Sequence, residues 1–341
     1  MMKTVLRKIL YADFMHPLWD LLDSAYGAIL MFHRIAPLDT GKLRYNDHLK
    51  VTPEYFEKLL LDFKQDGFTF LSMDELAELI RKRKKYKKIL LLTFDDGYQD
   101  NLDCAYPILK YHKVPATIYL ATGLLTEESL LWWNILEDFL LHNNSCILPD
   151  GQNLPCKTPQ EKEDVFLRLR TLILSIPPEN QEKELKKIFN GQLTQDFRDH
   201  NQLMITGEQL LLFSSNPFIT FGCHTHSHIS CGKLPYSIIK DDILKSLRFL
   251  QKYHIRPVHF AYPYGDDIQK DNNPAELLQE HSFKTAVTTF SGFLTVETMK
   301  FPFFLPRIFV SQYDNFSVRQ NFQNMRIAGK ISSLRNREIH R

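Results

Sequence analysis

The chain lacks long apolar runs, has few cysteines and carries almost no excess charge. No stretch approaches the roughly 18 consecutive apolar residues of a membrane-spanning helix, so we expect no such helix. The 5 cysteines form no CxxC pair, which argues against a disulfide framework and predicts reduced thiols in a cytoplasmic protein. The 42 basic and 40 acidic residues give a net charge of +2, which argues against a nucleic-acid-binding protein.

Basic clusters nevertheless occur at the termini and in one internal stretch. Charged residues interrupt the apolar N-terminal stretch, so we expect no cleaved signal peptide but an amphipathic helix at residues 2–23. That helix would pack on the core or lie on a membrane surface. The clusters at 81–88 and in the C-terminal tail would be solvated or would contact anionic lipid. A peripheral position at the inner membrane face is therefore one interpretation.

The order of predicted elements is typical of an α/β protein, and 341 residues suffice for one large domain or two. The run from Ile89 to Phe94 is apolar apart from Thr93, as expected for a strand buried on both faces of a parallel sheet. A helix is expected at about 102–111. Short apolar runs between helical patterns predict strands at 68–71, 89–94, 116–121, 218–223, 258–261 and 285–289.

Residues 125–215 depart from this alternation, because they read as helical. Thr158 and Glu161 form a capping box, and an apolar face follows at helical spacing: Val165, Leu169, Leu172, Ile173 and Ile176. We interpret the block as an insertion, with a lid over the substrate as one role. For Trp132 and Trp133 near its start, packing in the core is the first expectation, and a platform for a sugar ring is the alternative.

Two turns that follow predicted strands contain residues that are unusual there: a pair of aspartates in one, and a proline and a glycine in the other. Asp95 and Asp96 directly follow the strand at 89–94, so they either bind a cation or are solvated turn residues. The turn at 261–265 contains Pro263 and Gly265, and its backbone N–H groups could stabilise an oxyanion. In parallel α/β folds, active sites lie at the carboxyl ends of the strands, where both of these turns are expected.

Three histidines in five residues follow the strand at 218–223, which core packing explains poorly. His224 and His228 are four residues apart and can face one divalent metal from a single helical turn. In an extended segment, His226 could instead pair with either of them. The sequence therefore predicts a metal site and leaves two ligand pairings open.

Together these stretches resemble the polysaccharide deacetylases with the NodB-homology domain, carbohydrate esterase family four. The matching motifs are TFDDG (93–97), HTHSH (224–228) and AYPYG (261–265), and residues 28–34 and LPRI (305–308) resemble an opening and a late strand of one branch. The resemblance implies an α/β fold, a distorted (β/α)7-type barrel with a helical insertion. We predict an N-terminal helical extension at 1–26, the barrel at 27–320 with its insertion at about 125–215, and a basic tail at 321–341.

The resemblance also implies a divalent metal, with Zn²⁺ as the first expectation, held by Asp96, His224 and His228. Asp95 would be the catalytic base, and the backbone N–H of Tyr264 would stabilise the oxyanion. Two imidazoles and one carboxylate would leave positions for water and an acyl oxygen, which agrees with the interpretation of the residues themselves.

The chain departs from the best-known members of the family at two places. Those members carry an Arg early in the third motif, where this chain has Ala261, and a late Leu-x-His that is not evident here. Arg307 could replace the Arg by pairing with Asp95, or form an ordinary ion pair. His33 could supply the general acid, or be a buried core histidine. His226 is expected behind the ligands or exposed rather than as a ligand.

We therefore predict a metal-dependent carbohydrate N-deacetylase. Its substrate would be an N-acetylated amino sugar in a polysaccharide, an oligosaccharide or a lipid-linked glycan precursor of the cell envelope. The alternatives are a deformylase or amidase on another N-acyl compound, an inactive glycan-binding barrel, and a non-haem iron oxygenase with two histidines and one carboxylate. The oxygenase alternative gives Asp95 and the Tyr264 turn no role.

Overall fold

The computed structural model describes residues 25–39, 42–84, 87–148, 150–189, 199–232, 234–265 and 274–313. The predicted helix at 2–23 and the basic tail at 321–341 lie outside these residues. Strand β1 (Ala25–Phe32) begins within the stretch predicted as the N-terminal extension. Among the described residues, no helix combines the length and the apolar character that crossing a bilayer requires.

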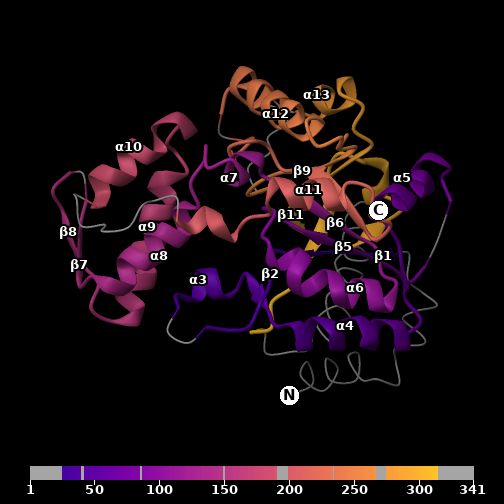
Figure 1. Cartoon of the computed structure of the whole chain (residues 1–341), viewed down its shortest axis with the longest axis horizontal. Helices are drawn as coiled ribbons and strands as arrows, with labels where there is room; N and C mark the ends of the chain where they lie inside the picture. Colours follow the sequence, from indigo (N-terminus) through magenta and orange to yellow (C-terminus); the bar gives the residue numbers. More distant parts are fainter. Residues whose placement is uncertain are drawn as a thin grey trace, which may run out of the picture.

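Seven parallel strands close into a barrel, in agreement with the predicted distorted (β/α)7-type fold (Figure 1). Each strand pairs with the next around the ring, and β1 closes the ring by pairing with both β5 and β13. The ring follows the order β1, β5 (Ile89–Phe94), β6 (Ala116–Leu120), β9 (Ile219–Cys223), β10 (His259–Ala261), β11 (Thr285–Ser291) and β13 (Leu305–Phe309). All residues of β5 are buried, as its nearly continuous apolar run predicts.

Short strands extend the sheet beyond the ring. Strand β4 (Thr69–Phe70) is parallel to the start of β5, and β12 (Leu294–Thr295) is antiparallel to the start of β1. Strands β2 (Arg34–Ile35) and β3 (Lys50–Val51) form a separate parallel pair. The short helix α3 (Arg44–Asp47) lies between these two strands in the sequence. The carboxyl ends of the ring strands therefore remain available for a site.

Helices that begin at clear sequence signals cover the barrel. Thr52 caps α4 (Pro53–Gln65), and Ser72 with Glu75 forms the predicted capping box of α5 (Met73–Arg81). The predicted helix at 102–111 starts as a π-helix, η2 (Asn101–Ala105), and continues as α6 (Tyr106–His112). The other helical segments outside the middle block are α7 (Thr122–Leu125), α11 (Gly207–Phe213), α12 (Tyr236–Gln251), α13 (Ala275–Glu280) and η5 (Thr298–Lys300).

The middle block forms a lobe beside the barrel, on the left in Figure 1. It contains α8 (Trp132–His142), β7 (Ser145–Ile147), β8 (Asn153–Pro155), α9 (Pro159–Ile173), α10 (Pro178–Phe189) and the 3-10 turn η3 (Asp199–Leu203). The expectation of a purely helical block is wrong, because β7 and β8 form an antiparallel pair. Asp150 accepts a hydrogen bond from the Gln152 N–H, and Gly151 has φ +85°, so this Asp-Gly pair turns the chain between the strands.

The lobe has its own apolar core, which is separate from the core between barrel and outer helices. Val165, Leu169 and Ile173 on α9 are buried in it, as the helical spacing predicts. Leu172 is 39% exposed and was misplaced by that prediction. It lies on the solvent side of the helix because residues 165, 169 and 173 already define the buried stripe.

Candidate metal and catalytic site

The predicted site residues meet at the carboxyl ends of the barrel strands. Asp95 and Asp96 follow β5, His224 follows β9, and Tyr264 lies in the turn after β10. Arg307 lies within β13. Parallel strands bring these separated segments to one end of the barrel, which explains how positions from 95 to 307 share one site.

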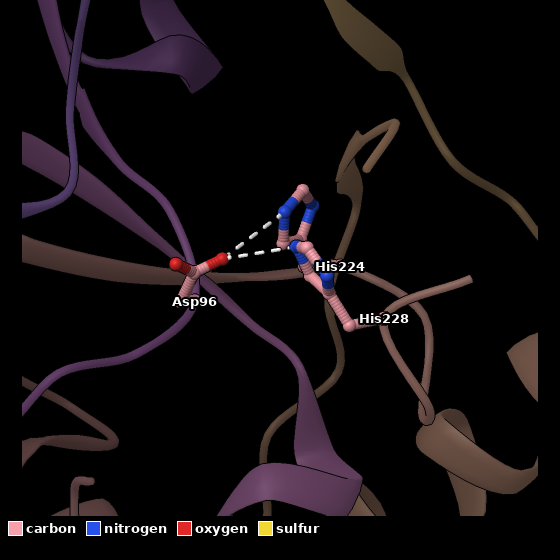
Figure 2. A group of neighbouring side chains, drawn as sticks. All are labelled: Asp96, His224 and His228. Carbon is pink, nitrogen blue, oxygen red and sulfur yellow. Dashed lines mark ion pairs between the residues drawn. The ribbon is translucent and has the colours of Figure 1, made fainter. Parts of the chain in front are cut away.

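Asp96, His224 and His228 form the only cluster of this kind in the described part of the chain, with ligand atoms within 4.8 Å of one another. One Asp96 carboxylate oxygen, Oδ1, lies 3.6 Å from His224 Nε2 and 3.1 Å from His228 Nε2 (Figure 2). Asp96 Oδ1 is buried and has no hydrogen-bond partner among the described residues. A buried oxygen of this kind, facing two imidazole nitrogens, fits a bound cation.

Hydrogen bonds on the far side of each imidazole orient the two rings. His224 Nδ1 lies 2.7 Å from the carbonyl oxygen of Ala261, so it carries the proton and leaves Nε2 with a free lone pair. His228 Nδ1 lies 2.9 Å from the Tyr264 hydroxyl. Burial lowers the pKa of His224 to about 4, which keeps its ring neutral near pH 7. A neutral imidazole is the form that binds a metal.

The ligand segment is a loop and not the helical turn that the four-residue spacing suggested. Thr225 and His228 have φ values of 64° and 51°, which no helix contains. Asp96 and Tyr264 also adopt left-handed backbone, with φ values of 72° and 59°. Such strained residues cluster at functional sites, where surrounding contacts hold them in place. The left-handed backbone at Thr225 and His228, and not a helical turn, therefore brings both rings to one point.

Arg307 forms the predicted ion pair with Asp95, and both side chains are buried. Its Nη1 and Nη2 atoms each lie 2.6 Å from one Asp95 oxygen, which is a bidentate arrangement. Arg307 also donates to the Thr288 carbonyl and to Thr93 Oγ1. Burial alone would raise the pKa of Asp95, but the adjacent guanidinium and its hydrogen bonds keep that pKa below its usual value. Asp95 is therefore held ionised.

His33 follows β1 and lines the same cavity as Asp95 and Asp96. Its Nδ1 atom is buried and has no hydrogen-bond partner among the described residues. Tyr264 also lines the cavity, and no described residue accepts a hydrogen bond from its backbone N–H. His33 and Tyr264 thus line the same cavity as the two aspartates, each with a group that has no hydrogen-bond partner among the described residues.

The cavity has a volume of about 280 Å³ and a wall rich in aromatic rings. Trp132 and Trp133 are buried in the lobe core, as predicted, and they also line the cavity; their role as a platform for a sugar ring stays a prediction. Trp133 packs 5.2 Å from the His228 ring, and its Nε1–H donates to the Tyr98 hydroxyl. The lobe therefore contributes a wall of the cavity.

Sequence reasoning missed several residues of this site. Tyr45 and Phe166 stack at 5.6 Å on the cavity wall, and Arg170 lies beside them, yet no local motif marks any of the three. The bond from the Tyr264 hydroxyl to His228 was also missed, because the motif pointed only to the backbone. His226 is not in the metal cluster, as predicted; it is buried, with Nδ1 2.9 Å from Thr122 Oγ1.

Comparisons with known proteins agree with this geometry. YxkH of Bacillus subtilis, named as a polysaccharide deacetylase, is 27% identical over 172 residues, 47% of this chain and 59% of that protein. The poly-beta-1,6-N-acetyl-D-glucosamine N-deacetylase of Staphylococcus aureus is 34% identical over 79 residues, 23% of this chain and 27% of that protein. The chain thus spans less than two thirds of the length of these relatives.

Solved structures show the same fold. The Streptococcus pyogenes deacetylase PplD superposes with a TM-score of 0.58 at 20% identity, covering 88% of this chain and 98% of that one. IcaB from Ammonifex degensii gives a TM-score of 0.55 at 17% identity, covering 88% and 97%. The family model for polysaccharide deacetylase matches residues 82–160 and 190–286. Because that match includes the two aspartates and the histidine loop and spans about half of the chain, the protein belongs to the polysaccharide deacetylase family.

Proposed function

We propose that the protein is a metal-dependent hydrolase that removes an N-acetyl group from an amino sugar in a glycan or glycolipid. The observation that carries the proposal is the Asp96, His224 and His228 cluster next to an Asp95 that Arg307 keeps ionised. The relative from Staphylococcus aureus, named for poly-N-acetylglucosamine, supports an amino-sugar substrate. The aromatic wall supports a sugar ring in the cavity.

Asp96, His224 and His228 would hold the metal, for which we propose Zn²⁺. Nitrogen and oxygen donors in a set of three are typical of catalytic zinc sites, which keep a position open. Bound there, a divalent ion would supply Lewis acidity and a water of lowered pKa. The bound ion would give Asp96 Oδ1 the partner that it lacks among the described residues. It would also accept the Nε2 lone pairs of His224 and His228.

The other site residues would move protons and stabilise charge. Asp95, ionised and fixed by Arg307, would accept the proton of the attacking water. His33 would donate a proton to the leaving amine from its place on the cavity wall. The Tyr264 backbone N–H would stabilise the oxyanion of the tetrahedral intermediate. Each role uses an atom that the barrel ends already bring to this cavity.

An acetate- and formate-release assay tests the proposal. The panel contains N-acylated monosaccharides, oligosaccharides and lipid-linked sugars, with Zn²⁺, Co²⁺, Mn²⁺ or Ni²⁺ added to chelator-treated protein. We expect metal-dependent acetate release that Asp95→Asn abolishes without loss of metal binding, whereas Asp96→Asn loses both. Formate release instead would favour the deformylase alternative. Metal-bound wild-type protein that hydrolyses no amide would refute the proposal and leave a glycan-binding barrel.

A further inference from the structure

Arg170 places a positive charge on the wall of the metal-site cavity. It lies on α9 one turn after Phe166, and both side chains line the cavity. Its guanidinium carbon lies 5.7 Å from the centre of the Tyr264 ring, whose hydroxyl contacts the ligand His228. The charge is therefore close to the expected reaction centre and not on a remote surface.

The charges in the cavity leave Arg170 without a carboxylate partner. The negative charge of Asp95 is balanced by its bidentate ion pair with Arg307, and Asp96 faces two imidazole nitrogens. Arg170 forms no ion pair with any described residue, and among the described cavity residues it is the one guanidinium or ammonium group. A half-buried arginine can have an aromatic partner and an anionic one; the face of Tyr264 is the aromatic partner of Arg170, and no described residue is its anionic partner.

Arg170 also belongs to a part of the chain that the family does not specify. The family model matches residues 82–160 and 190–286, so Arg170 and all of α9 after Gln160 fall in the gap between the two matched stretches. The catalytic aspartates and the histidine loop lie inside the match. The reaction chemistry is thus shared with relatives, whereas this cation is an addition of the lobe.

We propose that Arg170 binds a negatively charged group, a phosphate or a carboxylate, carried by the N-acyl amino-sugar substrate. This inference rests on the proposed function and narrows its substrate class to anionic sugars. The planar guanidinium can bind either group through two parallel hydrogen bonds. The aromatic wall would hold the sugar ring while Arg170 fixes its charged substituent near the site entrance.

A purely structural role makes a different prediction. If Arg170 only packed on Tyr264 to steady His228, its removal would slow the enzyme on every substrate and would weaken metal binding. If it recognises an anion, its removal raises KM for charged substrates alone. Arg170→Met keeps an unbranched apolar side chain at this position and removes the charge, and Arg170→Lys restores the charge without the planar fork.

The experiment compares charged and neutral substrates on zinc-loaded protein. N-acetylglucosamine 1-phosphate, N-acetylglucosamine 6-phosphate and N-acetylmuramic acid supply the two phosphate positions and a carboxylate, and neutral chitotriose is the reference. Arg168→Met is the matched control, because Arg168 is exposed on the same helix and does not line the cavity. Calorimetric binding of glucosamine 6-phosphate and of glucosamine gives a readout that needs no turnover.

We expect Arg170→Met to lower kcat/KM for at least one anionic substrate by roughly 10- to 100-fold, with less than about 3-fold change on chitotriose and partial recovery in Arg170→Lys. Arg168→Met should resemble the wild type. Equal losses on charged and neutral substrates, or no preference for charged ones, would overturn the inference. If no substrate is hydrolysed but the phosphorylated amine still binds through Arg170, the proposed function fails, and only the binding of an anionic sugar by Arg170 is retained.

Discussion

Replacing Arg307 by methionine isolates the contribution of the buried ion pair to stability and to catalysis. The variant keeps a side chain of similar length in β13 but leaves the Asp95 carboxylate, 2% exposed, without its two charged hydrogen bonds. Removing one partner of a buried pair costs about 3–5 kcal/mol, because the other charge stays buried and uncompensated. We expect a loss of that size in the free energy of unfolding at pH 7.

The loss should depend on pH with a sign that the Asp95 pKa determines. In the wild type this pKa lies below its ordinary value of 3.8, so the pair stabilises the protein above about pH 4 and less as the pH falls through the folded pKa. In Arg307→Met the carboxyl is buried without a cation, so its pKa rises above the unfolded value. That variant should lose stability as the pH rises, and its acidic limb of kcat/KM should move to higher pH.

Urea unfolding from pH 4 to pH 8, on chelator-treated protein, measures these differences. The double variant Arg307→Met/Asp95→Asn removes the orphaned charge, so we expect it to regain about 1–3 kcal/mol relative to Arg307→Met. Lys300→Met is the control for an exposed pair: Lys300 and Glu297 are 58% and 74% exposed, and their loss should cost below about 1 kcal/mol. A double variant no more stable than Arg307→Met would refute the reasoning.

Three further changes test other parts of the site. Tyr264→Phe removes the hydroxyl beside His228 Nδ1 but keeps the backbone N–H, so Zn²⁺ affinity in a competition titration should fall about 10- to 100-fold; unchanged affinity would show that the hydroxyl does not orient the ring. His33→Ala should slow amide hydrolysis about 100-fold or more but leave a p-nitrophenyl ester almost unaffected, because a phenolate leaving group needs no proton; equal losses on both would exclude an acid role. Gly265→Ala places a Cβ 2.3 Å from the Thr289 backbone nitrogen, so thermal unfolding should show a loss of about 1–3 kcal/mol; wild-type stability would mean that the turn can move freely.

The barrel could be predicted from sequence where burial leaves a simple pattern. Strand β5 is apolar in all its buried positions except Thr93, and strands of parallel sheets read this way because both faces are covered. The pair β7 and β8 could not be predicted so well. Each strand has three residues, too few for alternation to be visible, and both lie between strong helical patterns.

The cluster of Asp96, His224 and His228 shows how much residue spacing predicts about a site. One reading of the interval of four between His224 and His228 was that both rings face one point, and they do lie together beside Asp96. The helical turn expected for that reading is wrong, because a helical turn is only one way to bring residues four apart to one point. The loop achieves it with two left-handed residues, Thr225 and His228, and with a bond from each Nδ1 to another strand end. Neither partner, Ala261 nor Tyr264, is near the histidines in sequence, so the spacing alone could not supply them.

One wall of the cavity is formed by residues of short sequence motifs and the other by residues that no motif marks, and this difference bears on which substrate binds. The inner wall consists of strand ends of the barrel, where short motifs fix the positions of acids and imidazoles. The outer wall comes from α3 and α9, where Tyr45, Phe166 and Arg170 meet only because the lobe folds against the barrel end. Since Phe166 and Arg170 lie outside the matched family regions, relatives can share the reaction and still differ in the group held beside it. The amide chemistry is therefore expected to survive changes in α9, whereas the preference among amino sugars should follow residue 170.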